Sequence, residues 1–207
     1  MFVENCRDTM MIGSRDSFPE GGSMQSKTRA IVVMVLIIGL MAGCSTGSVT
    51  KDEGDALLNR SQASRQEWNK VDPQLEAFAK KGYGYAFFPE ITKGGLLVGG
   101  AHGRGVVYEK GQHIGYADLT QMSAGFQAGL QYYSQLIVFE NQPAMDKFKR
   151  NEIDFAASAS AVYADTGAAM SAQFVDGVAV FVRPTRGAMA EASLGGQQIT
   201  YLPKGSP

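Results

Sequence analysis

Residues 82–110 read GYGYAFFPEITKGGLLVGGAHGRGVVYEK, and this stretch decides the fold. Its apolar and small residues follow a period of two, whereas the residues before it follow a helical period. Segments 82–89, 94–101 and 104–110 are therefore predicted to be short strands, separated by turns rich in glycine or charge. Glycine permits tight turns and close contact between strands. The stretch predicts the first part of a glycine-rich sheet.

The strand pattern continues beyond residue 110. Residues 113–120 form the next predicted strand, and AGFQAGLQYYSQLIVFE (124–140) gives the longest strand signal. In the longer segment apolar residues alternate with glutamines, which is typical of a half-buried antiparallel sheet. Residues 141–151 are predicted to form a short helix, with Asn141 as its cap. Small-residue strands are expected over 152–203, including 169–177.

Two helices are predicted before the sheet. Thr50 and Glu53 form a capping box for a helix that runs to about Lys70. A second helix starts at Asp72-Pro73 and ends at Gly82. Their apolar stripe either packs on the sheet, which we favour, or lies in a bilayer interface; it consists of Trp68, Val71, Leu75 and Phe78. The predicted fold class is α+β, with N-terminal amphipathic helices packed on a glycine-rich, mainly antiparallel sheet that forms a sandwich or open barrel.

Composition excludes some functions. The chain has 207 residues, a formal net charge of -1 and 44% hydrophobic residues. These values are typical of a globular protein and give no charge footprint for nucleic-acid binding. Its only cysteines are Cys6 and Cys44, so the chain after residue 44 has no disulfide and depends on its core for stability.

Residues 24–43 have the order of a secretory signal. Lys27 and Arg29 precede the apolar run AIVVMVLIIGLMAG (30–43), which is shorter than the ~20 apolar residues of a membrane span. The small residues before Cys44 indicate a lipobox, so Cys44 is the predicted lipidation site and the first mature residue. The alternative is a buried apolar helix in which Cys44 is incidental.

The predicted organisation follows from this signal. Residues 1–23 mix acids and bases, and we expect translation to begin at Met24, which leaves them as an upstream segment. The remaining parts are a signal peptide over 24–43, a tether over 44–52 and one domain over 53–207. Ser45 replaces the Asp that would indicate retention at the inner membrane. We therefore expect a lipid-anchored protein on the periplasmic face of the outer membrane.

Four stretches, in order, resemble the SYLF domain family. They are AFFPEITKGGLLVGGAHGRGVVY (86–108), SAGFQAGLQYYSQLIVF (123–139), AMDKFKRN (144–151) and RGAMAEASLGG (186–196). The resemblance implies binding to lipid or a membrane surface, with no known catalysis and no cofactor. Two positions depart from the family pattern, namely Leu96, which is usually Phe, and Glu191, which lies in a run that is often small and apolar.

The candidate lipid-binding residues are four cations and one aromatic residue. Cations beside exposed backbone N–H groups are suited to a headgroup phosphate, and Trp is common at membrane interfaces. These residues are Lys80, Lys81, Lys93, Arg104 and Trp68. An ordinary solvated face is the alternative for the cations. The expected partners are phospholipids, with envelope proteins or cell wall as the partners of a rival structural lipoprotein.

Catalytic and metal-binding interpretations are weak. His102, His113, Asp118 and Ser123 could be written as a hydrolase triad, but no Gly-x-Ser-x-Gly elbow is present. Two histidines without a mature cysteine or an HExxH motif make a poor zinc site. The glycine-rich 94–105 stretch lacks the Gly-Lys-Ser/Thr of a phosphate loop. We therefore expect no enzyme activity, cofactor or metal.

Overall fold

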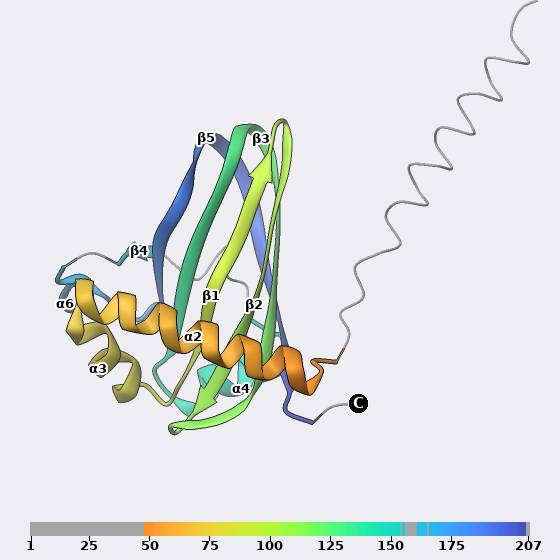
Figure 1. The fold of residues 1–207 in the computed structure, drawn as a ribbon. Coiled ribbons are helices and arrows are strands. Elements are labelled where there is room, and N and C mark those ends of the chain that lie inside the picture. Colours follow the sequence, from red (N-terminus) through yellow and green to blue (C-terminus); the bar gives the residue numbers. More distant parts are fainter. Residues whose placement is uncertain (1–47, 154, 156–160, 165, 206–207) are drawn as a thin grey trace, which may run out of the picture. The chain divides into compact units, whose positions relative to one another are not determined.

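A computed structural model describes residues 48–153, 155, 161–164 and 166–205. The predicted upstream segment 1–23, the signal peptide 24–43 and Cys44 lie outside the described residues. Thr46–Pro207 form one compact unit with its own hydrophobic core. The unit has the predicted α+β class, with a mostly antiparallel sheet (Figure 1).

The two N-terminal helices have the predicted caps. Helix α2 spans Lys51–Val71, and both halves of the capping box between Thr50 and Glu53 are present. Helix α3 spans Pro73–Lys81; the carboxylate of Asp72 accepts a hydrogen bond from the backbone N–H of Gln74 and so caps its first turn. The sharp restart between the helices follows from Pro73, which cannot continue α2.

The sheet has the strand order β1-β2-β3-β5-β4, and only the β4–β5 pair is parallel. Helix α4 (Gln142–Lys149) follows β3, and helix α6 (Ala168–Ser171) follows β4. The strands are β1 (Gly84–Gly95), β2 (Val98–Glu109), β3 (Gln112–Phe139), β4 (Ala161–Tyr163) and β5 (Val178–Pro203).

The long strand β3 reverses direction halfway, so that it encloses the β1–β2 hairpin. Its first half pairs with β2 and its second half pairs with β1, both antiparallel. Gly125 and Gly129 flank the reversal with φ angles of 136° and 133°, which side-chain-bearing residues rarely adopt. Strand β5 follows β3 along its whole length and reverses with it. We call the end of the sheet where these strands reverse the apex, at the top of Figure 1.

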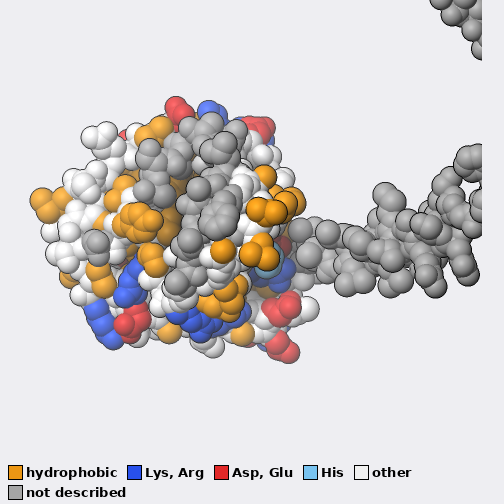
Figure 2. Space-filling model, turned by 90° about the horizontal axis from the view of Figure 1, so that it is seen from above, with side chains coloured by type: hydrophobic (Ala, Val, Ile, Leu, Met, Phe, Trp, Pro, Cys, Tyr) orange, Lys and Arg blue, Asp and Glu red, His pale blue; other side chains and the backbone are white. Residues whose placement is uncertain are grey.

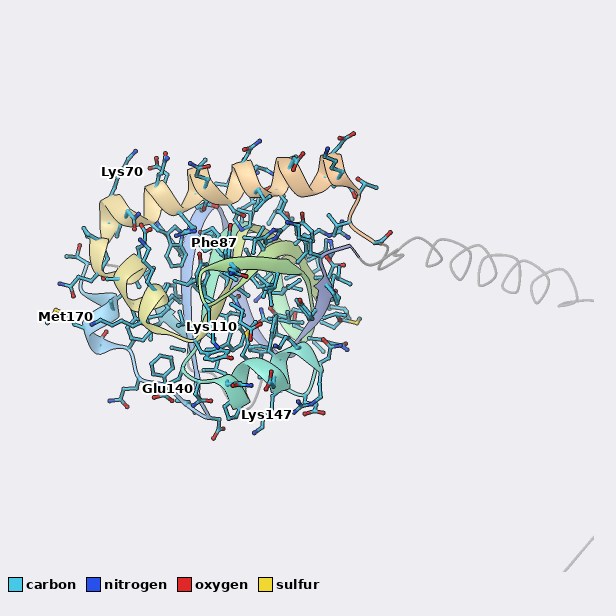
Figure 3. The ribbon with its side chains drawn as sticks, turned by 90° about the horizontal axis from the view of Figure 1, so that it is seen from below. Lys70, Phe87, Lys110, Glu140, Lys147 and Met170 are labelled. Atoms are coloured by element: carbon cyan, nitrogen blue, oxygen red, sulfur yellow. The ribbon has the colours of Figure 1, made fainter. Side chains whose placement is uncertain are left out.

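Both faces of the sheet are covered away from the apex. On one face, which we call the α2 face, Trp68 and Leu75 pack against Phe87, Val106 and Leu136. On the other, the α4 face, helix α4 packs on a second cluster that includes Ile137 and Phe139. Figure 3 shows α2 and α4 on opposite sides of the sheet. Trp68, Leu75 and Phe78 of the predicted helical stripe therefore pack on the sheet in this structure.

Close strand packing explains part of the glycine content. A Cβ atom at Gly105 would lie 2.7 Å from Cδ1 of Phe88 and 2.9 Å from the carbonyl oxygen of Phe87. Both distances are shorter than real Cβ contacts, so a larger residue would push β1 and β2 apart. Gly105 thus allows the ring of Phe88 to fill the α4-face core.

The structure differs from the sequence prediction at four points. Residues 94–101, predicted as one strand, contain the β1–β2 turn, because β1 continues to Gly95 and β2 begins at Val98. Residues 112–139 form one continuous bent strand, because the reversal keeps its pairing with β5. Residues 169–177, predicted as a strand, begin in helix α6 and end in a turn. Of the two predicted arrangements, a sandwich or an open barrel, the sandwich is wrong, because the described strands form one open, mostly antiparallel sheet. Within the described part of the chain, no helix is both long and apolar enough to span a membrane.

Candidate functional site

A group of exposed apolar side chains lies at the apex. The register places Met122, Gly100, Gly94 and Leu130 in one row across four strand segments, with all four on the α2 face. The two glycines in the middle of this row have no side chain, while the side chains of Met122 and Leu130 project from the sheet on either side of them. We call the exposed group the apical patch; its members are Leu96 (72% exposed), Leu97 (72%), Val98 (66%), Met122 (69%) and Leu130 (48%).

The β1–β2 turn is held against the bend of β3. The backbone N–H of Gly125 donates a hydrogen bond to the carbonyl oxygen of Leu97 at 3.0 Å. This bond fixes the turn while leaving the side chains of Leu96 and Leu97 in solvent. Seen from above, several groups of hydrophobic side chains lie at this end of the molecule, with Lys and Arg side chains beside some of them (Figure 2).

A polar row lies directly behind the apical patch on the α2 face. It contains Thr120, His102, Thr92 and Tyr132, which are neighbours across the same four strand segments. The guanidinium of Arg186 lies 4.0 Å from the ring centroid of Tyr132. Because same-face rows are two residues apart, this row is about 7 Å from the Met122–Leu130 row.

The four predicted cations do not form one site. Lys80 and Lys81 end helix α3, next to the start of β1, whereas Lys93 lies near the apex end of that strand. Nine strand residues separate Gly84 from Lys93, which is about 30 Å. Lys80 also forms an ion pair with Glu76 at 2.9 Å, and Lys93 is half-buried.

Arg104 has a structural partner on the neighbouring strand. Its Nε atom donates to Oδ1 of Asp118 at 2.7 Å, and the Asp118 side chain is only 4% exposed. The hydrogen bond from the guanidinium to Asp118 raises the pKa of Arg104 above its ordinary value. A buried carboxylate needs such a partner, so Arg104 is committed to Asp118.

Trp68 is buried beneath helix α2. Its indole N–H donates to the hydroxyl of Ser134 at 2.8 Å, and its ring meets that of Phe87 edge-on at 5.6 Å between centroids. The residue is 3% exposed. This burial removes Trp68 from the surface that a membrane could contact, because the ring reaches a bilayer only if α2 leaves the sheet.

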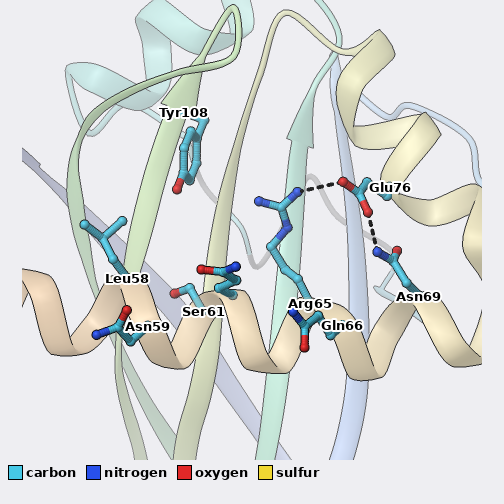
Figure 4. Close-up of a pocket in the computed structure, with 9 residues that line it drawn as sticks. Leu58, Asn59, Ser61, Arg65, Gln66, Asn69, Glu76 and Tyr108 are labelled. Atoms are coloured by element: carbon cyan, nitrogen blue, oxygen red, sulfur yellow. Dashed lines mark hydrogen bonds and ion pairs between the residues drawn. The ribbon is translucent and has the colours of Figure 1, made fainter.

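A polar cleft of about 420 Å³ runs between α2 and the sheet (Figure 4). Its centre is Arg65, which donates to the Tyr85 hydroxyl at 3.0 Å and to Glu76 at 3.3 Å. Hydrogen bonds from Lys80 and Asn69 hold the pKa of Glu76 below its ordinary value. The sequence analysis missed this cleft, although its polar residues recur at helical spacing on α2; they are Asn59, Gln62, Arg65, Gln66 and Asn69.

The residues of the hypothetical hydrolase triad are not brought together. Asp118 and His102 lie in adjacent rows on the α2 face, with Asp118 beside Arg104. Ser123, five residues beyond Asp118 along β3, lies on the opposite face. His113 is about 17 Å along the strand from Asp118. Among the described residues, no group of three or more His, Cys, Asp or Glu side chains is arranged to bind a metal.

His113, near the start of β3, is expected to make the stability of the domain depend on pH. Burial, followed by the charge of Lys204, lowers its pKa below 6.5, and its buried Nε2 atom has no hydrogen-bond partner. The unfolded state therefore binds more protons near pH 6.5, and the free energy of unfolding falls as the pH drops through that value. We expect the urea midpoint to fall more steeply between about pH 7.5 and 5 for the wild type than for His113→Gln. Equal slopes would contradict this role.

These features define a class of protein: an α+β domain whose curved sheet is covered by helices at one end and is apolar at the other. Residues 120–202 match the sequence model of the Ysc84 family, described as "Las17-binding protein actin regulator". The match runs from the first half of β3 to the last residues of β5, and over this part the chain is similar to the Ysc84 family.

One curated relative adds a second comparison. Beta cell expansion factor A of Aeromonas veronii is 25% identical over 130 residues, which make up 61% of this chain and 48% of that protein. The chain thus spans about half the length of this relative. The family match includes three of the four stretches that carry the resemblance, namely 123–139, 144–151 and 186–196.

Proposed function

We propose that this protein is an envelope lipoprotein, anchored through Cys44 on the periplasmic face of the outer membrane, whose SYLF domain binds phospholipid without catalysis. The apical patch is the observation that carries this proposal. Five large hydrophobic residues with exposed side chains belong to the apex. The apex is the end of the sheet away from the helices in Figure 1. Exposed apolar side chains that gather at one end of a domain are typical of sites that contact membranes or other proteins.

Charge favours a membrane as the partner. Residues 91–104 and 119–132, which form the two inner turns of the apex, contain no Asp or Glu. The cations nearest the apex are Lys93 in the first turn and Arg186 on the neighbouring β5 segment, which also carries Glu191. Arg104 is paired with Asp118 and is not assigned to this contact. Cations close to a bilayer contribute about 1 kcal/mol each on anionic surfaces. Lys80 and Lys81 are far from the apex and are not assigned to this contact.

The anchor is a separate part of the proposal. The lipobox supports it, and two or more acyl chains give stable membrane attachment. In cells given labelled palmitate, we expect the label on the processed wild-type protein and none on a Cys44→Ser variant. If the wild-type protein is unlabelled and found in the cytosol, both the proposed anchor and the proposed envelope location are wrong.

The polar cleft beside α2 favours a second candidate function. Its amide side chains and Arg65 offer hydrogen bonds to a polar partner, such as a protein segment or cell-wall material. In this alternative the protein is a structural or interaction lipoprotein that recognises no specific lipid. Co-purifying proteins would support it, whereas a phospholipid in the native mass spectrum would support lipid binding.

Vesicle flotation tests the lipid-binding proposal. The compact unit 46–207 lacks the apolar segment 30–43, which would bind vesicles by itself. We expect this unit to float with vesicles that contain phosphatidylglycerol, and to float less at high salt because salt screens the cation contribution. A unit that stays at the bottom of the gradient at low salt would contradict the proposal.

A further inference from the structure

The apex carries a more specific inference, which rests on the proposed phospholipid binding. We propose that the apical patch inserts below the headgroups of a phospholipid leaflet, with Tyr132 and Arg186 at headgroup level. The partner is thus a bilayer that accepts apolar side chains among its acyl chains. In this arrangement, insertion of apolar side chains contributes more to binding than recognition of a particular headgroup.

The layering of side chains along the α2 face supports insertion. The outermost row is apolar, and the next row contains Thr92, His102, Thr120 and Tyr132. Helix α2 contacts the sheet behind that row, at Arg104 and Ser134. The spacing of about 7 Å between the rows matches the 5–10 Å depth at which apolar faces lie in the membrane interface. An inserted patch would therefore leave the polar row among the headgroups.

The Tyr132–Arg186 pair has the chemistry of that boundary. A tyrosine has an apolar ring and a polar hydroxyl, and it is common where one end of a residue is apolar and the other wet. Arg186 stacks on this ring at 4.0 Å and is 61% exposed, although its guanidinium also contacts Glu90 at 2.8 Å. An exposed guanidinium that contacts one carboxylate still has donors for a lipid phosphate.

Hydrogen bonds within the backbone at the apex favour insertion. The two arms of the β1–β2 hairpin pair with each other as far as Gly95 and Gly99, and β3 encloses them. The carbonyl of Leu97 accepts from Gly125, and the N–H of Leu96 donates to the carbonyl of Val98. Unpaired backbone groups are costly in hydrocarbon, and these bonds lower that cost.

The length of the tether allows the patch and the anchor to occupy one leaflet. Glu53, in the first turn of α2, lies 3.8 Å from Arg104, and six strand residues separate Arg104 from Val98. The start of α2 is therefore about 20 Å from the apex along the sheet. The chain from Cys44 to Lys51 reaches at most about 25 Å when extended. That reach is enough for the apex to enter the membrane that holds the acyl chains.

Single-cysteine labelling tests this inference. Residues 46–207 contain no cysteine, so Leu97→Cys, Met122→Cys and Met170→Cys each give one labelling site. Met170, which is 77% exposed in α6, is the matched control for Met122. Each variant carries an environment-sensitive fluorophore and is mixed with vesicles of phosphatidylglycerol and phosphatidylcholine. Some of these vesicles contain lipids with brominated acyl chains.

We expect a blue shift and bromine quenching at positions 97 and 122, and neither at 170. If the variants float with vesicles but position 97 is not quenched, the insertion is wrong while lipid binding stands. If nothing floats, both proposals fail. A blue shift at 97 that needs no vesicles and grows with protein concentration would assign the apex to self-association, which also overturns the inference. Unchanged thermal unfolding of each variant shows that its fold is intact.

Discussion

Replacing Trp68 by Ala is expected to lower the free energy of unfolding by about 3–5 kcal/mol, the usual cost of removing a large buried aromatic side chain. The indole fills the space between α2 and the sheet, touches Phe87 and donates to Ser134. Its loss leaves a cavity and removes the partner of a buried hydroxyl. Urea unfolding of the unit 46–207 measures this change.

Trp68→Phe is the matched control. It keeps an aromatic ring but loses the hydrogen bond to Ser134. The Ser134 hydroxyl still lies 3.4 Å from the carbonyl oxygen of Arg183. A smaller loss of about 1–2 kcal/mol is expected. A different result would follow if Trp68 were a membrane-contacting residue: Trp68→Ala would then abolish vesicle binding and leave the unfolding free energy unchanged. That outcome would contradict the packing of α2 on the sheet.

Arg104→Met is expected to cost about 3 kcal/mol of stability, the lower end of the range for breaking a buried ion pair. The lower end applies because the Arg104 side chain is 26% exposed. The substitution leaves Asp118 buried without a cation, and a buried carboxylate without a partner is strongly unfavourable. Thermal or urea unfolding at neutral pH measures the effect.

The double variant Arg104→Met/Asp118→Leu separates the two roles of Arg104. Both charges are then absent, so most of the lost stability should return. If Arg104 instead served mainly to bind headgroups, the single variant would change the unfolding free energy by no more than about 0.5 kcal/mol, as exposed substitutions do. Vesicle binding would then drop in the single and the double variant alike.

Local signals predicted the helices well because their determinants are local. The capping box at Thr50 and Glu53 and the Asp72-Pro73 restart act over three or four residues, and both helices begin as expected. The period of two likewise located the strand-rich region after Gly82. By contrast, residues 169–177 carry small and apolar residues without a strong period, and tertiary packing against α3 determines their structure.

The reversal of β3 could not be predicted from its own residues. Gly125 and Gly129 are compatible with a strand interior, a bulge or a turn, and the choice depends on pairing with β1 and β5 across the sheet. The β1–β2 turn was missed for a similar reason, because by its own residues the segment Leu96–Val98 resembles an ordinary apolar strand. The glycine pairs on both sides of it were the available signal for an exposed turn.

The predicted cation cluster failed to assemble for a similar reason. Lys80 and Lys93 are close in sequence, but an extended strand carries them about 30 Å apart. Arg104 was expected to face a lipid, and only the register of β2 and β3 reveals Asp118 as its neighbour. Charge alone did not indicate which cations have a protein partner.

Flotation of Met122→Asp beside Met170→Asp tests the central claim most directly, namely that the apical patch is the membrane contact. Both methionines are highly exposed, so neither substitution should disturb the core. Vesicle affinity is expected to fall about tenfold or more for Met122→Asp, because a buried Met contributes about 1.5–3 kcal/mol, and to stay unchanged for Met170→Asp. Equal flotation of the two variants would contradict the claim.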